Sequence, residues 1–351
     1  MFFDSVTYKE ELNKAWHAIG GNTELFRKRF LITGATGLIG SFVIDMLLYA
    51  NESEDAEIEI WALGRDETKL KNRFRSHLST EHLHFIIQDV TDRLESDTDY
   101  DYIFHLAGDG YPAAFRMRPV ETMTPAFVGT YNILDYMAKR NIGRFLLAST
   151  GEVYGQVEGK RTFAENDYGY IDTMSSRSCY PIAKKAAETL CASYVKEYGI
   201  DAVVARLSHV YGANNSPKDN RATVQFIQNA IKKEDIVLHS SGKQMRSYTY
   251  VVDAVVGLFY IAIRGISGEV YNIANPESCI TIADFARKTA EIGGVNCIHN
   301  LEDEVMKAEK TPIEYAVLDS SKLEKLGYRA AYKPDDGIRN SLKILEEISK
   351  K

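Results

Sequence analysis

The chain has 351 residues, with 42 Lys and Arg against 49 Asp and Glu, which gives a formal net charge of −7. Hydrophobic residues make up 45% and charged residues 26%, as in ordinary globular proteins, and this composition excludes a disordered or fibrous chain. The acidic balance argues against non-specific binding to nucleic acid or to an anionic membrane, but it leaves room for a local basic pocket for a phosphorylated small molecule. The length predicts two domains, or one large α/β unit with a smaller lobe.

The cysteines and the apolar runs of the sequence indicate the cellular compartment in which we expect the protein. The four cysteines form no Cys-x-x-Cys pair and have no histidine cluster nearby, so we expect reduced thiols and no metal site. No apolar run approaches the roughly 20 residues that span a bilayer. The N-terminus lacks the basic and apolar regions of a signal peptide. We therefore expect a cytoplasmic protein that binds neither a membrane nor nucleic acid.

The first two thirds of the chain alternate between strands and helices. Residues 4–28 predict one or two polar helices whose apolar side is Leu12, Trp16, Ile19 and Leu25. Short apolar runs then predict strands at 30–33, 58–63, 84–88, 102–106, 144–149 and 202–207. Helices are predicted at 41–49, 119–140 and 180–198. This alternation predicts right-handed βαβ units in a doubly wound parallel sheet, the Rossmann arrangement of the α/β class, with helices on both faces.

The last third has a different texture. Residues 211–221 predict a loop, 223–233 a helix, 246–250 a segment leading into a helix at 252–263, 269–274 a strand, and 281–292 and 319–326 further helices. We predict an N-terminal helical extension (1–28), a dinucleotide-binding domain (29–207, with 245–275 contributing) and a smaller substrate-binding lobe (208–244 and 276–351).

A glycine-rich segment joins the first predicted strand to its helix. Gly34 permits a tight turn, Gly37 lets the backbone approach a pyrophosphate, and Gly40 lets the helix pack close to the strand. The helix N-terminus offers free N–H groups to phosphates. The spacing is GxxGxxG, and the strand before and the helix after it support a dinucleotide site. The cofactor residues predicted in this segment are Gly34, Thr36, Gly37, Leu38, Ile39 and Gly40.

Three further strand ends extend the predicted cofactor site. Asp89, followed by Val90, could accept a hydrogen bond from an adenine amine, and the small residues of Leu106-Ala107-Gly108 leave room for the adenosine. The position after the second strand, where an acidic residue binds the ribose of NAD, is Gly64, and Arg65 follows it. Arg65 therefore favours NADP, while the neighbouring Asp66 keeps NAD open.

Tyr180 and Lys184 lie four residues apart on a predicted helix and so project from one face. A tyrosine is a poor base at neutral pH, and a nearby ammonium group favours its phenolate. A Tyr-x-x-x-Lys pair is common by chance, but here it follows a dinucleotide loop. The hydroxyl of Thr150, at the end of the fifth predicted strand, can hold a reacting substrate oxygen.

These segments, kept in order, resemble an extended short-chain dehydrogenase/reductase. The resemblance covers about residues 29–345 and is carried by Thr33–Gly40, Ser149–Gly155, Tyr180-x-x-x-Lys184, Arg206–Gly212 and Arg246–Asp253. Within that superfamily the chain is similar to nucleotide-sugar epimerases, 4,6-dehydratases and UDP-glucuronate decarboxylases. The stretch 164–189 looks most like the decarboxylase branch. The resemblance implies a nucleotide-diphosphate sugar as substrate, oxidation at sugar C4, and a homodimer formed through the helices 119–140 and 180–198.

Other site residues follow from the resemblance. It implies cofactor contact by Ser208 and substrate contact by Tyr111 and His209. Arg221 and Arg246 are candidates for the substrate pyrophosphate, because a guanidinium group forks onto phosphate oxygens. His209 stands where the family often has Asn, and packing against the cofactor is an alternative role for it, just as Arg221 could be a solvated loop residue.

The segment after Thr150 departs from the dehydratase pattern. Dehydratases have an Asp that acts as general acid where this chain has Gly151, whereas Glu152 is retained. Glu152 is a candidate base, and the alternative is a carboxylate that only caps the following backbone. The additional basic residue that some decarboxylases carry in the C-terminal lobe has no counterpart within Thr311–Asp319.

The leading hypothesis is an NAD(P)-dependent nucleotide-sugar epimerase. In it Tyr180 removes the C4 hydroxyl proton, Lys184 binds the cofactor ribose and tunes Tyr180, and Thr150 holds O4. The alternatives are a nucleotide-sugar decarboxylase acting on a uronate, an NADPH-dependent ketoreductase, a 4,6-dehydratase, and a cofactor-binding regulator without turnover.

Overall fold

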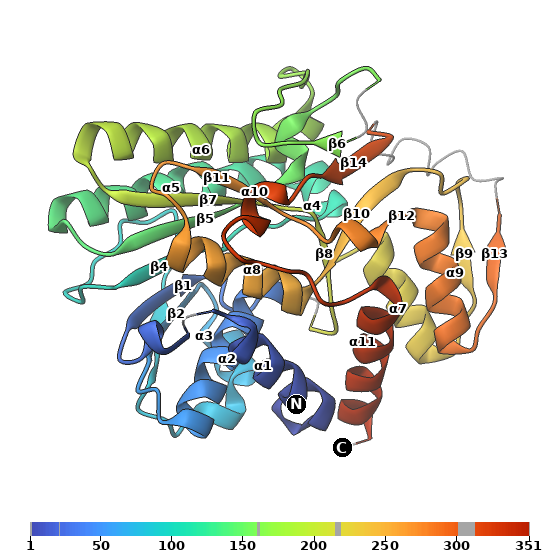
Figure 1. The fold of residues 1–351 in the computed structure, drawn as a ribbon, viewed down its shortest axis with the longest axis horizontal. Coiled ribbons are helices and arrows are strands. Elements are labelled where there is room, and N and C mark those ends of the chain that lie inside the picture. The colour runs from blue at the N-terminus through green and yellow to red at the C-terminus, as the bar shows by residue number, and fades with distance from the viewer. Residues whose placement is uncertain (1, 21, 160–161, 215–218, 301–312, 351) are drawn as a thin grey trace.

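A seven-stranded parallel sheet forms the centre of the fold. The computed structural model describes residues 2–20, 22–159, 162–214, 219–300 and 313–350 (Figure 1). Among them the strand order is β3-β2-β1-β4-β5-β7-β11, and every pairing is parallel. The predicted doubly wound fold is thereby confirmed. The strands are β1 (Arg29–Thr33), β2 (Glu59–Gly64), β3 (Leu83–Ile87), β4 (Tyr102–His105), β5 (Arg144–Thr150), β7 (Asp201–Leu207) and β11 (Val270–Ile273).

Helices cover both faces of this sheet, as predicted. The helices α5 and α6 lie on one face, and α2 and α8 lie on the other (Figure 1). Successive side chains of β1 enter different cores, because strand residues alternate between faces: Leu31 packs with α5 and α6, and Phe30 and Ile32 pack with α2 and α8. The helices are α2 (Leu38–Glu54), α3 (Glu67–Arg73), α4 (Pro112–Met117), α5 (Pro119–Arg140), α6 (Cys179–Tyr198) and α8 (Val251–Arg264).

Shorter elements build the C-terminal part. In the described residues, a second sheet has the order β12-β10-β14-β6, with β8 paired to β10, and β13 pairs with β9. The helices α7, α9 and α11 lie beside these strands (Figure 1). The elements are β6 (Thr162–Phe163), β8 (His209–Tyr211), α7 (Ala222–Lys232), β9 (Ile236–Leu238), β10 (Met245–Tyr250), β12 (Cys279–Thr281), α9 (Ile282–Gly293), β13 (Cys297–His299), β14 (Tyr315–Leu318), α10 (Ser321–Glu324) and α11 (Pro334–Ser349).

Several C-terminal expectations need correction. The helix predicted at 319–326 is only the single turn α10, and the loop predicted at 211–221 begins with the last residue of β8, while its residues 215–218 lie outside the described residues. The segment 245–275, which was expected to contribute to the dinucleotide-binding domain, supplies α8 and β11 to the large sheet and its core and β10 to the second sheet. The helix α11, which was not predicted, buries Ile338 and Leu342. The domain boundaries themselves stay predictions.

The N-terminal extension packs into the main core. It consists of α1 (Val6–Ala18) and a short 3₁₀ turn (Asn22–Leu25), and the predicted apolar side chains Leu12 and Trp16 are fully buried. The hydroxyl of Tyr8 donates to Asp45 of α2 at 2.7 Å, and Arg73 of α3 is paired with the same carboxylate. The extension is therefore tied to the dinucleotide half by a buried polar cluster.

A buried carboxylate on α1 links the extension to the C-terminal elements. Glu11 is 1% exposed, accepts from the hydroxyl of Tyr250 at 2.6 Å, and accepts from the amide of Asn340 on α11 at 2.7 Å. Burial raises its pKa from 4.5 to about 7, although both hydrogen bonds act in the opposite direction. The folded protein therefore holds a proton on Glu11 between these pH values that the unfolded chain has released.

The proton held on Glu11 predicts how the free energy of unfolding depends on pH. The contribution of protonated Glu11 is fully present below about pH 4.5 and is lost as the pH rises towards 7. The variant Glu11→Gln stays neutral, so we expect its free energy of unfolding to gain about 3 kcal/mol on the unsubstituted protein between pH 5 and 8. Urea unfolding at several pH values measures this difference. A difference that does not change with pH would contradict the assignment.

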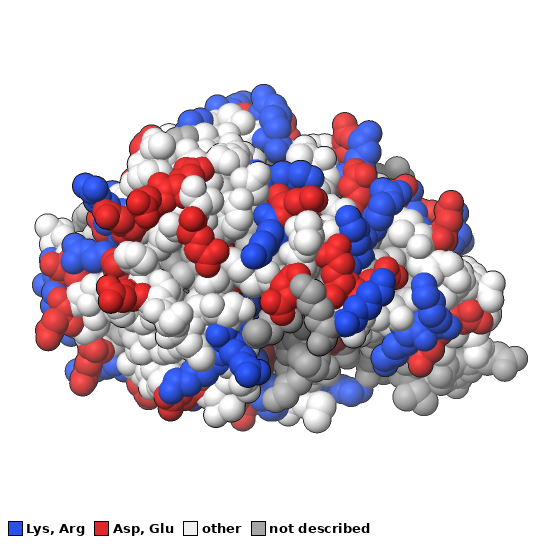
Figure 2. Space-filling view, turned by 90° about the horizontal axis from the view of Figure 1, so that it is seen from below, with Lys and Arg blue, Asp and Glu red and all other residues white. Residues whose placement is uncertain are grey.

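The outer surface on the side of α1 and α11 carries mixed charge. Acidic and basic side chains are interspersed over the face seen from below (Figure 2). None of the helices in the described part of the chain is both long and apolar enough to span a bilayer.

Candidate active site

A cavity of about 510 Å³ opens at the carboxyl ends of the large sheet and extends to the second sheet. This is where ligands bind in doubly wound sheets, beside the point at which strand order reverses between β1 and β4. It brings together most of the predicted site. The predicted residues that line it are Gly34, Gly37, Leu38, Ile39, Gly40, Leu106, Ala107, Gly108, Tyr111, Thr150, Glu152, Tyr180, Lys184, Ser208, His209, Arg221 and Arg246. Four predicted cofactor residues, Thr36, Arg65, Asp89 and Val90, are not among its lining residues.

The loop after β1 fits a dinucleotide. Gly34 has a φ of +65°, and a Cβ there would lie 2.5 Å from the carbonyl oxygen of Leu106. A Cβ on Gly40 would lie 2.4 Å from the carbonyl oxygen of Gly34. Glycine is therefore required at both positions for the turn and for close packing, which leaves the N-terminus of α2 open toward the cavity. Gly108, whose φ is +140°, has open space where a Cβ would stand.

A threonine holds the two loops of the switch point together. Thr33 Oγ1 lies 2.8 Å from Nδ1 of His105 and accepts from the backbone N–H groups of Leu106 and Ala107, at 3.1 Å each. Burial lowers the pKa of His105 to about 3, so the ring is neutral. The two loops that face the predicted cofactor site are thus fixed relative to each other.

Arg65 and Asp89 contact each other just beyond the ends of β2 and β3. A guanidinium nitrogen of Arg65 lies 3.3 Å from Asp89, which also accepts from the backbone N–H and hydroxyl of Thr91. Burial opposes ionisation of Asp89, but the bonds from Thr91 and the charge of Arg65 outweigh it and lower the pKa. Asp89 therefore has fewer free lone pairs for an adenine amine than the sequence suggested.

The proposed redox residues meet on the cavity wall. Tyr180 and Lys184 lie on the first turns of α6, and Lys184 is 4% exposed and donates to the carbonyl oxygen of Ala148 in β5 at 2.6 Å. Burial lowers the pKa of Lys184 to about 8, although Glu188 acts to raise it. Thr150 ends β5, so the segment that Lys184 holds carries the hydroxyl expected to bind O4.

The expected activation of Tyr180 is not found in the protein alone. Burial, followed by the charge of Glu152, raises the pKa of Tyr180 to about 12, and the hydrogen bond with Thr150 opposes this shift. The prediction rested on the spacing from Lys184 and could not include burial. An oxidised nicotinamide, when bound, would supply the hydride acceptor and a positive charge near this phenol. The protein contributes a position for the hydroxyl that is fixed by the stack of the Tyr180 ring on Phe115.

Glu152 is paired with a residue to which the sequence assigned no role. Arg177 donates to both oxygens of Glu152, at 3.1 and 3.4 Å. The Arg177 guanidinium lies 4.7 Å from the ring of Phe115, which is stacked on Tyr180 at 4.8 Å and 17°. Arg177 stands three residues before Tyr180, and this spacing was the available signal, whereas Phe115 could be suspected only from its place four residues after the predicted substrate residue Tyr111.

The remaining predicted substrate residues differ in their bonding. Arg221 is paired with Asp219 at 2.6 Å and donates to the carbonyl oxygen of Val210. Arg246 is 2% exposed, and its guanidinium donates to three backbone carbonyl oxygens, those of Met245, Ile313 and Glu314.

Two further cavity residues are held by neighbouring strands. Burial lowers the pKa of His209 to about 3, so it offers a neutral ring. Ser208 shares a 2.6 Å hydrogen bond with Thr249. Whether these residues and the two arginines contact the substrate or cofactor stays a prediction.

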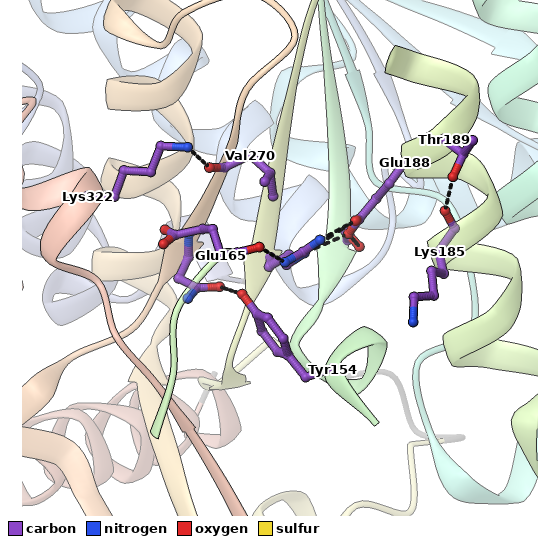
Figure 3. Close-up of polar contacts among 10 residues, drawn as sticks. Tyr154, Glu165, Lys185, Glu188, Thr189, Val270 and Lys322 are labelled. Atoms are coloured by element: carbon purple, nitrogen blue, oxygen red, sulfur yellow. Dashed lines mark hydrogen bonds and ion pairs between the residues drawn. The ribbon is translucent and has the colours of Figure 1, made fainter. Parts of the chain in front are cut away.

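A buried ion pair supports the site from behind. Arg206 of β7 is paired with Glu188 of α6 at 2.7 Å and donates to the carbonyl oxygen of Glu165 at 2.9 Å; Glu165, Glu188 and Tyr154 surround it (Figure 3). Glu188 also accepts from the hydroxyl of Ser149 at 2.5 Å. Since Ser149 precedes Thr150, this network joins the helix of Tyr180 to the strand end that faces it.

Within the described residues, no group of three or more His, Cys, Asp or Glu side chains is placed to hold a metal ion.

Comparison with known proteins identifies a family model and several relatives that this chain resembles. Residues 30–274 match the model of the NAD dependent epimerase/dehydratase family. UDP-glucuronic acid decarboxylase 1 of Xenopus tropicalis is 33% identical over 272 residues, which are 78% of this chain and 62% of that protein. UDP-glucuronic acid decarboxylase 6 of Arabidopsis thaliana is 30% identical over 331 residues, 93% of this chain and 90% of that protein.

A solved structure has the same fold. The UDP-glucuronic acid 4-epimerase of Bacillus cereus, in complex with UDP-glucuronic acid and NAD, superposes with a TM-score of 0.75 and 23% identity over 91% of this chain and 99% of that one. The chain spans only about three fifths of the length of the first vertebrate relatives, 62% and 60%. The match nevertheless covers the dinucleotide loop, Tyr180 and Lys184. The chain therefore belongs to the NAD dependent epimerase/dehydratase family and is an enzyme of the short-chain dehydrogenase/reductase type.

Proposed function

We propose that this enzyme acts on a UDP-linked uronate by transient oxidation at C4 and then releases the carboxyl group as CO2. The decarboxylase, held as an alternative on the sequence, thereby replaces the epimerase as the leading hypothesis. Support comes from the decarboxylase relatives that align with most of this chain. The chain spans about three fifths of the first of them, so the residues of the site carry the proposal.

The proposed reaction uses the residues on the cavity wall in sequence. Tyr180 takes the proton of the C4 hydroxyl as the hydride leaves C4, while Thr150 holds the oxygen. The resulting 4-keto uronate is a β-keto acid, so breaking the C5–C6 bond releases CO2 and leaves the electron pair in an enolate whose oxygen is O4. A proton then adds to C5, the hydride returns to C4, and Tyr180 returns its proton to O4. The cofactor is regenerated in each turnover.

The observation that carries this proposal is the wall beside Thr150. Gly151 faces Leu318, and a Cβ on Gly151 would lie 3.1 Å from that side chain. Leu318, Phe163 and Ala316 all line the cavity. CO2 is neutral and apolar, so a wall without polar groups receives it more favourably than it receives a charged group, and this favours breaking the C5–C6 bond. The same wall offers no proton to a leaving C6 hydroxyl, which disfavours a 4,6-dehydratase.

The epimerase remains the second candidate, because of the segment that closes the cavity. Ile313, Tyr315, Ala316 and Leu318 line the cavity, and none of them is a basic residue that could protonate C5; Thr311 lies outside the described residues. In an epimerase the 4-keto sugar would keep its carboxylate, rotate within the cavity and receive the hydride on its other face.

Product analysis separates the candidates. The protein, with NAD⁺ and UDP-glucuronate, is followed by proton NMR while evolved CO2 is trapped. We expect CO2 and a UDP-pentose in equal amounts without net cofactor consumption. UDP-galacturonate without CO2 would establish the epimerase in its place. Stoichiometric oxidation of NADPH would point to a ketoreductase, and failure of several UDP-sugars to change the bound cofactor would revive the regulator.

Cofactor preference is open to a direct test. The family is NAD dependent, and we propose that Arg65 also admits NADP(H), with Asp89 as a competing partner for its guanidinium. We expect Arg65→Ala to weaken NADP(H) by about tenfold, the worth of one partly exposed charged hydrogen bond, and to leave NAD(H) nearly unchanged. Fluorescence titration measures both, with the exposed Arg75→Ala as control. Equal loss for both cofactors would remove this role from Arg65.

A homodimer is part of the same proposal. In the described part of α5, Val120, Met123, Phe127 and Tyr131 are 66, 37, 41 and 45% exposed, and their spacing places them along one side of the helix. We expect Phe127→Asp to convert a dimer into a monomer in light scattering, because it places a charge in the buried interface. Ile266→Asp, 66% exposed and remote from α5 in sequence, is the control. A monomeric unsubstituted protein would contradict the proposal.

A cytoplasmic location is also proposed. It is supported by the cysteines, all four of which are free thiols, as expected in a reducing compartment.

A further inference from the structure

One cation in the cavity has a partner that could be exchanged. Arg177 and Glu152 both line the cavity, and their side chains are 36 and 25% exposed. The other cations of the wall are less exposed than Arg177: Lys184 donates to a backbone carbonyl oxygen and is 4% exposed, and Arg246 donates to three such oxygens and is 2% exposed. Arg221 is 25% exposed and donates to the carbonyl oxygen of Val210 as well as to Asp219. The Arg177 pair is the contact that a second carboxylate could enter.

Stacked rings fix this guanidinium group relative to the reacting hydroxyl. Arg177 lies over Phe115, which is 1% exposed and is itself stacked on the ring of Tyr180. The three groups come from two segments, because Arg177 lies in the 3₁₀ turn Ser176–Ser178 that leads into α6, Tyr180 lies in the first turn of α6, and Phe115 lies on α4. A substrate whose C4 hydroxyl contacts Tyr180 therefore meets a cation at a fixed place.

We propose that Arg177 selects sugars that carry a carboxylate, by releasing Glu152 and binding the substrate carboxylate in its place. This inference rests on the proposed uronate substrate and names the residue that recognises it. A carboxylate at C6 is separated from the C4 carbon by C5 alone, so a sugar oriented by Tyr180 and Thr150 presents it close to its reacting atom. A guanidinium group binds either carboxylate through the same two-pronged geometry.

The exchange has a consequence for Glu152. While Arg177 donates to both of its oxygens, Glu152 is held in the ion pair as a carboxylate. Once the substrate carboxylate takes that place, Glu152 is free beside the sugar to carry a proton to or from C5. With a neutral hexose the ion pair between Arg177 and Glu152 stays formed. The same contact therefore discriminates between substrates, and it frees Glu152 only when the sugar carries a carboxylate.

Calorimetry on the protein saturated with NAD⁺ tests this exchange. The probes are UDP-glucuronate and UDP-glucose, which differ at C6 alone. We expect UDP-glucuronate to bind about tenfold more tightly, as a charge-assisted bidentate pair would give. Arg177→Gln should abolish this difference and change UDP-glucose affinity by less than about twofold, and Arg177→Lys should restore part of the difference.

Substitution of the partner, Glu152, should change the affinity for UDP-glucuronate in the opposite direction. Glu152→Gln removes the competing carboxylate, so UDP-glucuronate should bind several-fold more tightly while turnover falls. A purely structural ion pair would instead give equal weakening of both nucleotides in either variant, and that result overturns the proposal, as does an unsubstituted protein that binds both equally. If Arg177→Gln does not fold, the sign of the Glu152→Gln effect still decides. Preference for UDP-glucuronate without CO2 release would retain the role of Arg177 and refute only the decarboxylation.

Discussion

Replacing Tyr180 by Phe should reduce turnover by about a thousandfold, within the range for loss of a positioned acid–base group. The ring would keep its stack on Phe115, and only the hydroxyl, which contacts the substrate proton, is removed. Cofactor affinity should therefore change by less than about twofold. Steady-state turnover and fluorescence titration of NAD(H) measure the two quantities separately.

The matched control is Tyr168→Phe, which removes a hydroxyl from a tyrosine that is 71% exposed. The pH profile adds a second test. The pH dependence of kcat reports the ionisation of Tyr180 with cofactor and substrate bound, so a rise that continues to high pH would show that burial, which raises the pKa to about 12 in the protein alone, still dominates there, and an inflection near neutrality would show that the bound cofactor offsets it. A Phe variant with near-normal turnover would show that another group takes the C4 proton.

Replacing Lys184 by Met should weaken both cofactor binding and turnover, each by about ten- to a hundredfold, because one ammonium group is expected to bind the ribose and to position Tyr180. The same variant should be no less stable than the unsubstituted protein. Burial lowers the pKa of Lys184 from 10.5 to about 8, so the folded state carries a desolvated charge at neutral pH that Met removes. Thermal unfolding, cofactor titration and kcat measure the three effects.

The adjacent lysine is a suitable control, because the Lys185 side chain points away from the Arg206 network in Figure 3. Lys185→Met should leave all three quantities nearly unchanged. The stability of the unsubstituted protein should itself gain from Lys184 as the pH rises from about 8 to 10.5, since over this range the unfolded chain holds the proton that the folded state has lost. A Lys184→Met variant that unfolds much earlier but binds cofactor normally would assign Lys184 a structural role alone.

The central sheet could be predicted because a parallel sheet covered on both faces requires continuous apolar strands. The runs Phe30–Ile32 and Phe145–Ala148 are short, continuous and followed by turn residues, as strands buried on both faces are. The strands β6, β12 and β14 escaped prediction, because each has only two to four residues and exists through pairing with distant segments, as Leu318 does with Phe163. The sixteen-residue helix α11 was missed although its apolar residues recur at helical spacing.

The site residues likewise divide into those that the sequence could predict and those that it could not. Tyr180 and Lys184 could be found because their spacing on one helix fixes their shared face. The pair between Glu152 and Arg177 could not, because two short 3₁₀ turns (Gly151–Tyr154 and Ser176–Ser178), 25 residues apart, meet only in the folded chain. Burial was equally invisible, and it reverses the expected direction of the Tyr180 pKa shift. Arg65 and Asp89 were predicted separately, and their contact could not be foreseen. Asp89 competes with a 2′-phosphate for the guanidinium of Arg65, and Arg65 competes with an adenine amine for the carboxylate of Asp89.

The measurement that tests this account most directly follows the C4 hydrogen of the substrate. UDP-glucuronate carrying deuterium at C4 is converted by the protein with a catalytic amount of NAD⁺, and the product is examined by NMR and mass spectrometry. If the hydride leaves C4 and returns within one turnover, the deuterium is retained at C4 of the released UDP-pentose, and the total of oxidised cofactor does not change. Loss of the deuterium to solvent, or its accumulation in free reduced cofactor, would contradict the transient oxidation on which every assigned role depends.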